Sequence, residues 1–140
     1  WDSTLPSLYV HLYGEGLGEG SSTFVKLFAG PDLDELGETE VIENEANPAF
    51  EAHCQIQFAF DIRQVLRLEV HDVRLGHCVG VAEATIEEIV QDGGESLYEL
   101  DHDPKSVPQG FTVTGHIGVV GELVSSIAQV STADDGTVDY

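Results

Sequence analysis

Apolar residues recur at every second position in one short segment after another, and Gly, Pro, Asn or Asp bound each segment. This alternation is typical of β-strands that bury one face, whereas an amphipathic helix repeats about every 3.6 residues. The pattern predicts eight strands, at residues 7–17, 23–30, 38–46, 52–60, 65–73, 77–86, 96–103 and 112–124. We therefore expect an all-β fold, an eight-stranded antiparallel Greek-key β-sandwich.

The segment 65–73 shows the alternation most clearly. Its apolar members are Leu66, Leu68 and Val70, and its polar members are Arg67, Glu69 and His71. Successive side chains of a strand point to opposite faces, so we expect the apolar set to face the core and the polar set to face water.

One short helix is predicted near residues 85–92. Thr85 can cap its first turn, with Glu88 three residues later as the partner of a capping box, and Gly93 can end it. The apolar residues Ile86, Ile89 and Val90 would share one face.

The chain of 140 residues fits a single domain, and its 41% of hydrophobic residues can fill a core. We assign residues 1–124 to the sandwich. Residues 125–140 lose the alternation and become polar and acidic, so we expect an acidic C-terminal tail or arm.

The charge is strongly negative, with 26 Asp and Glu against five Lys and Arg, a formal net charge of −21. Nucleic acids and anionic lipids are bound through clusters of Lys and Arg, so nucleic acid is excluded as a partner and membrane contact is disfavoured. A protein partner with a basic surface is the functional expectation.

Cys54 and Cys78 are too few and too far apart for a disulfide framework, and we interpret both as reduced thiols, although a bridge between them stays open. No segment resembles a signal peptide or a membrane span. These features favour an intracellular location, either cytoplasmic or peripheral to a membrane-bound assembly.

The middle of the chain, GETEVIENEANPAFEAHCQIQFAFDIRQVLRLEVHDV (37–73), has a T-E-V-I strand, an Asn47-Pro48 turn, an apolar strand and a strand that ends in an acidic loop. This order resembles the C2 domains, and among them those of copines. SSTFVKLF (21–28) and LGHCVGVAEATIEEIV (75–90) extend the resemblance, which covers about residues 7–124.

The resemblance implies a cup of Asp carboxylates, from two loops at one end of the sandwich, that binds Ca²⁺ and then lipid headgroups. Ca²⁺ needs about six to eight oxygen ligands. In the first loop, Ser22 and Gly16 stand where the family carries Asp, and Glu19 is nearby but out of register.

In the second loop, Asp72 matches the first Asp of the family's pair, Arg74 occupies the second position, and His77 lies in the shortened remainder. Asp72 is the only retained ligand-type match, and Arg74 places a positive charge where the ion would sit. We therefore expect no Ca²⁺ and no other cofactor.

A zinc site from His71, His77 and Cys78 has suitable ligand types, but the chain has no second cluster with the spacing of a structural zinc site. We expect loop and strand-edge histidines in water, and no metal. No nucleophile elbow, phosphate loop or zinc-protease motif is present, so we predict no catalytic residues and no enzyme.

These observations support a calcium-independent C2-like module for protein interaction or scaffolding, as a domain or accessory subunit of a larger assembly. The alternative is a peripheral membrane-targeting C2 domain that binds phospholipid with or without Ca²⁺. Leu75 in the second loop and Leu17 in the first are the apolar candidates for membrane contact.

Overall fold

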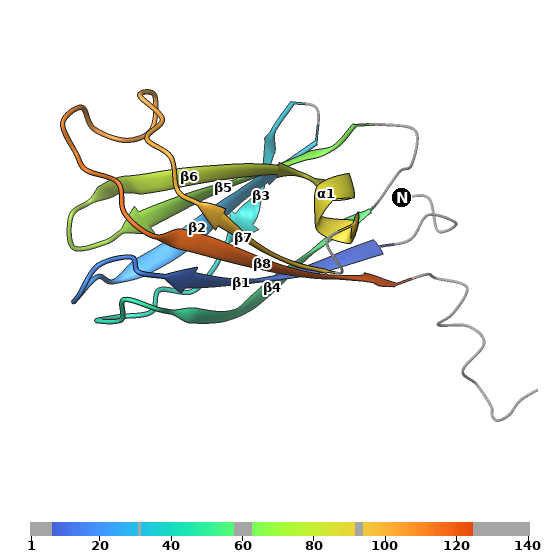
Figure 1. The fold of residues 1–140 in the computed structure, drawn as a ribbon, viewed down its shortest axis with the longest axis horizontal. Helices are drawn as coiled ribbons and strands as arrows, with labels where there is room; N and C mark the ends of the chain where they lie inside the picture. Colours follow the sequence, from blue (N-terminus) through green and yellow to red (C-terminus); the bar gives the residue numbers. More distant parts are fainter. Residues whose placement is uncertain (1–6, 31, 58–62, 92–93, 125–140) are drawn as a thin grey trace, which may run out of the picture.

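A computed structural model describes residues 7–30, 32–57, 63–91 and 94–124, which form two four-stranded antiparallel sheets packed face to face (Figure 1). The first sheet has the order β4 (Ala49–Gln57), β1 (Ser7–Glu15), β8 (His116–Val124), β7 (Glu95–Glu99). The second has the order β3 (Asp34–Glu38), β2 (Thr23–Ala29), β5 (Val65–Asp72), β6 (His77–Thr85). The predicted eight-stranded antiparallel Greek-key β-sandwich is confirmed.

The chain crosses repeatedly between the sheets. β1 lies between β4 and β8, while β2 pairs with β3 and with β5. The edge strands are therefore β4 and β7 in one sheet and β3 and β6 in the other.

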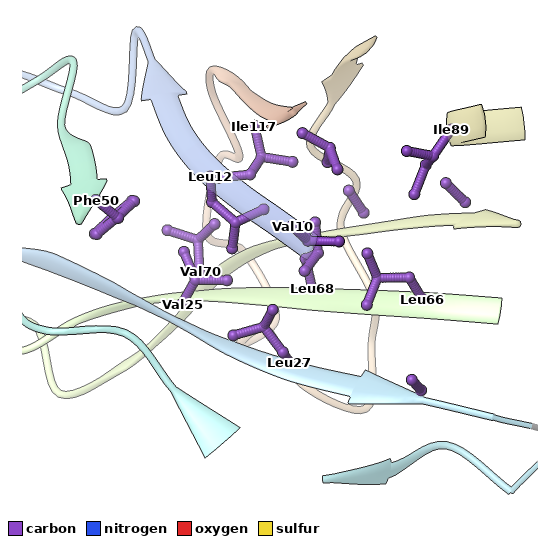
Figure 2. Packing of buried hydrophobic residues seen from close by; sticks show 14 of the residues in the cluster. Val10, Leu12, Val25, Leu27, Phe50, Leu66, Leu68, Val70, Ile89 and Ile117 are labelled. Carbon is purple, nitrogen blue, oxygen red and sulfur yellow. The ribbon is translucent and has the colours of Figure 1, made fainter. Parts of the chain in front are cut away.

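The core lies between the sheets, where the apolar positions of β1, β2 and β5 meet (Figure 2). The expected inward set of β5 is confirmed, because Leu66, Leu68 and Val70 are at most 2% exposed. Val10 of β1 and Val25 of β2 are completely buried against them.

The short helix α1 (Ile86–Gln91) follows β6 directly. The Glu88 backbone N–H donates to Thr85 Oγ1 at 3.2 Å, and the Thr85 N–H donates to Glu88 Oε1 at 3.3 Å, so the predicted capping box is confirmed. Ile86 and Ile89 are buried. The predicted end at Gly93 lies outside the described residues.

The third predicted strand was wrong in position, because β3 ends where the prediction of 38–46 begins. Residues 39–46 still run beside β2, with an isolated bridge between Thr23 and Ile42. The ladder is interrupted because the Val25 N–H donates to the Thr39 side-chain oxygen at 2.9 Å, where a regular strand would offer a carbonyl.

The seventh and eighth strands are shorter than predicted, since residues 100–115 form one long loop between them. Asp101 and Val81 exchange two backbone hydrogen bonds, of 2.8 and 3.0 Å, which brings this loop onto the edge strand β6. The first and fourth strands also differ in extent, at residues 7–15 and 49–57. The predicted tail, 125–140, and residues 58–60 lie outside the described residues.

Both cysteines are free thiols, as interpreted from the sequence. Cys78 is buried, and Cys54 on β4 is half-buried. Burial raises the pKa of the Cys54 thiol to about 11, so that this thiol is protonated at neutral pH.

Candidate functional site

The loops 16–22 and 73–76 lie together at one end of the sandwich (Figure 1). They enclose a pocket of about 240 Å³. Its lining consists of Leu17, Gly18, Glu19, Ser21, Asp72, Arg74 and Leu75. In the C2 domains that the sequence resembles, Ca²⁺ would lie between these two loops.

Asp72 ends β5 and is only 6% exposed. Its Oδ1 accepts a hydrogen bond from the backbone N–H of Arg74 at 2.9 Å, and its carbonyl accepts from the N–H of Gly76 at 2.8 Å. One carboxylate oxygen therefore stabilises the turn of its own loop, a common use of Asp in turns.

Arg74 joins the two loops, because its guanidinium Nη1 donates a hydrogen bond to the carbonyl of Gly20. Gly20 has a φ of +77°, a backbone conformation that glycine adopts without strain. The guanidinium lines the pocket beside Asp72, and its charge opposes the entry of a divalent cation.

Ser22 is buried and has a structural role in the first loop. Its Oγ accepts from the N–H of Asn44 at 3.1 Å, and its carbonyl accepts from the N–H of Val73 at 2.9 Å. Gly16 donates its N–H to Asn47 Oδ1 at 2.9 Å. These contacts connect the first loop to the second loop and to the turn before β4.

The structure thus brings Glu19, Asp72 and Arg74 to one pocket and leaves Gly16, Ser22 and His77 outside its lining. Glu19 is exposed. Among the described residues, Asp72 belongs to no group of three His, Cys, Asp or Glu side chains whose ligand atoms lie close together.

His77 makes its contacts outside the pocket lining. Its Nδ1 lies 2.8 Å from the carbonyl oxygen of Cys78, and its ring contacts the Phe111 ring edge-on with 4.9 Å between centroids. It therefore packs against the long loop 100–115 and is only partly exposed, which corrects the expectation of a histidine in water.

A second polar cluster lies on the outer face of β5. Arg67 Nη2 contacts Asp103 Oδ2 at 2.7 Å and Glu69 Oε2 at 3.2 Å, and Arg67 Nη1 contacts Glu83 Oε2 at 2.8 Å. Burial lowers the pKa of Arg67, but hydrogen bonds to Asp103, Glu83 and Glu69 outweigh it and raise the pKa overall. Two hydrogen bonds lower the pKa of Asp103. The larger effect comes from the backbone N–H of Lys105 and the smaller from the guanidinium of Arg67.

This cluster corrects the expectation that the polar set of β5 faces open water, since the side chains of Arg67 and Glu69 are each only 15% exposed. The loop 100–115 covers them through Asp103 and Ser106. Alternation along β5 could have indicated that Arg67, Glu69 and His71 share a face, but no local signal shows that residues beyond β7 return to cover it.

Two four-stranded antiparallel sheets packed as a sandwich, with loops gathered at one end, are an architecture that this chain shares with solved C2 domains. Residues 9–100 match the C2 domain family, and the chain belongs to that family. C2 domains are mainly non-enzymatic modules for interaction with proteins or membrane lipids.

The chain is similar to Copine-A of Dictyostelium discoideum, with 34% identity over 64 residues. The matched segment is 44% of this chain and spans 11% of that copine's length.

Two solved structures share the fold. A C2 domain of plant Extended Synaptotagmin 1 has a TM-score of 0.66 at 18% identity, over 86% of this chain and 95% of that one. A structure described as a C2 domain has a TM-score of 0.61 at 26% identity, over 85% and 98% of the two chains. Within the described residues, no helix is long and apolar enough to cross a membrane.

Proposed function

We propose that this C2 domain is a calcium-independent module that binds a protein partner with a basic surface, in the manner of a scaffold or accessory domain. Calcium independence is supported above all by the position of Arg74. Its guanidinium lines the pocket between the loops and donates a hydrogen bond to the Gly20 carbonyl. The proposal includes an intracellular location, cytoplasmic or peripheral to a membrane-bound assembly, and no catalytic activity.

A basic partner is supported by the charge on one side of the sandwich. No Lys or Arg occurs between Lys26 and Arg63, a stretch that includes the edge strands β3 and β4. Exposed carboxylates follow these edges, and we call the following set the acidic strip: Glu35, Glu38, Glu43, Glu45 and Glu51. Complementary charge would steer a basic surface to these edges and fix its orientation.

The test is capture of partners from an extract of the source cells by the full chain, at physiological salt, in parallel with EGTA and with Ca²⁺. One bait replaces Glu38, Glu43 and Glu51 of the acidic strip by Gln. The matched control replaces Glu15, Glu99 and Glu122, which are equally exposed and lie elsewhere, so that the net charge changes equally.

We expect proteins with basic surfaces to be retained by the wild type and by the control but lost from the strip variant, with and without Ca²⁺. Retention that requires Ca²⁺, or that survives in the strip variant, would contradict the proposal.

Membrane binding is the second candidate function, and one observation favours it. Val73 and Leu75, at the tip of the loop between β5 and β6, are 48% and 53% exposed, whereas Leu17, the candidate expected in the first loop, is buried. Co-sedimentation with phosphatidylcholine vesicles, with and without phosphatidylserine and Ca²⁺, tests this candidate. Binding that is lost when Val73 and Leu75 become Ser, but kept when the exposed Leu97 and Leu123 become Ser, would place membrane contact at this loop.

A further inference from the structure

Three side chains with metal-binding atoms meet on the outer face of the second sheet. Glu69 and His71 are two residues apart on β5, so they point to the same side. An irregularity in the register after Val70 sets Cys78 of β6 opposite His71. The carboxylate oxygen, imidazole nitrogen and thiol sulfur of these three residues all lie within 4.8 Å of one another.

The spacing suits a small tetrahedral ion. Zinc bonds of about 2.0–2.3 Å place neighbouring ligand atoms about 3.3–3.8 Å apart. Glu69 Oε1 and His71 Nε2 are 3.1 Å apart and share a hydrogen bond. A bound ion would take the place of the shared proton. The Cys78 sulfur, which donates to the Gly80 carbonyl at 3.4 Å, lies within 4.8 Å of both the Glu69 and the His71 ligand atoms.

Two of the three ligands are held in orientation by neighbouring groups. Glu69 Oε2 accepts from Arg67 Nη2 at 3.2 Å and from Ser106 Oγ at 3.3 Å, which leaves Oε1 directed at His71. The His71 ring stacks on Phe24 with 5.2 Å between centroids. Such supporting contacts orient metal ligands and raise affinity.

The charge around the cluster also favours a cation. Glu69, Glu83 and Asp103 share the single guanidinium of Arg67, so negative charge is in excess. The side chains of His71 and Glu69 keep 20% and 15% of their surface exposed, which gives an ion a path from solvent. Nitrogen and thiolate ligands select zinc over calcium or magnesium.

We propose that Glu69, His71 and Cys78 form a zinc-binding site, with the fourth position taken by water. This departs from the sequence expectation of no metal, which considered His77 and omitted Glu69. The site is distinct from the pocket between the calcium-type loops, and it holds whether or not the protein-interaction proposal is correct. A cysteine binds zinc as the thiolate, so binding releases the thiol proton and should become tighter as pH rises.

The test is titration of the reduced, metal-free full chain with Co²⁺, which is coloured when it occupies a zinc site, followed by displacement with Zn²⁺. We expect a thiolate-to-cobalt charge-transfer band and tetrahedral d–d bands at one ion per chain. Cys78→Ala should abolish the charge-transfer band, and His71→Gln and Glu69→Gln should each weaken binding at least ~10-fold.

The matched controls are Cys54→Ala and His53→Gln, since Cys54 and His53 lie side by side on β4, where the His53 ring stacks on His11. Both controls should bind like the wild type. In addition, Zn²⁺ should raise the melting temperature of the wild type and of Cys54→Ala but not that of Cys78→Ala. A spectrum without a thiolate band, or a band lost in Cys54→Ala and kept in Cys78→Ala, would overturn the proposal.

Discussion

Arg67 on β5 and Asp103 in the loop after β7 form an ion pair with 2.7 Å between Nη2 and Oδ2, although 36 residues separate them along the chain. The pair connects the second sheet to a loop that leaves the first sheet. Because Arg67 is also shared with Glu69 and Glu83, it organises the polar cluster on the outer face of β5.

Replacing Arg67 by Ala should lower the free energy of unfolding by about 2–3 kcal/mol, because three carboxylates lose their shared partner and two of them are largely covered. Urea unfolding at pH 7 measures the change. Arg63→Ala, at an exposed position, is the control and should stay within about 0.5 kcal/mol of the wild type. Equal effects of the two variants would show that the cluster does not stabilise the fold.

The stability of the fold should depend on pH through the Glu40 carboxylate. Backbone N–H groups, first that of Glu51 and then those of Glu40 itself and of Ala52, lower the pKa of Glu40 below its ordinary value of 4.5, against a smaller opposing effect of burial. A carboxyl whose pKa is lower in the folded chain stabilises that chain above the unfolded pKa, and this contribution is lost as pH falls through the folded pKa.

Glu40→Gln should therefore be less stable than the wild type at pH 7, and the difference should shrink as pH falls below about 4.5. Denaturant unfolding between pH 7 and pH 3 measures the difference. Glu43→Gln, at another exposed position of the same segment, serves as the control. A difference that is constant across this range would show that the Glu40 carboxylate does not act through its charge.

Gly118 on β8 lies directly beneath the aromatic ring of its neighbour Tyr13 on β1. A Cβ at residue 118 would overlap the ring atoms, so Gly118→Ala should destabilise the fold by about 1–3 kcal/mol. Thermal unfolding checks this value. In the Tyr13→Ala background the same substitution should cost much less, and full additivity of the two changes would disprove the steric cause.

Thr85 should stabilise the start of the short helix α1. Thr85→Ala removes the side-chain half of the capping box with Glu88 and should cost about 1 kcal/mol. Chemical denaturation compares it with Thr114→Ala, an exposed threonine outside any helix or strand. Indistinguishable midpoints would mean that the cap does not contribute.

The sequence was informative where structure depends on local pattern. Alternation placed Leu66, Leu68 and Val70 in the core, and the spacing of Thr85 and Glu88 located the helix start. Both follow from the geometry of a single element.

Non-local contacts explain what the sequence did not show. The Thr39 hydroxyl, in place of a backbone carbonyl, accepts the hydrogen bond from the Val25 N–H. This contact depends on the packing of residues 39–46 beside β2, which the sequence does not show. The loop 100–115 returns to cover Glu69, so a strand face that looks solvated in the sequence is half-buried. The cluster of Glu69, His71 and Cys78 depends on an irregular register between β5 and β6, which no spacing within one strand reveals.

Calcium independence is tested by a calorimetric titration of the full chain with Ca²⁺, repeated with Asp72→Asn. Asn keeps the side-chain oxygen that accepts from the Arg74 N–H, so this variant should fold normally. We expect no saturable heat from either protein up to about 1 mM, the weak end of protein calcium sites. Saturable heat from the wild type that disappears in Asp72→Asn would contradict calcium independence and move membrane targeting to first place.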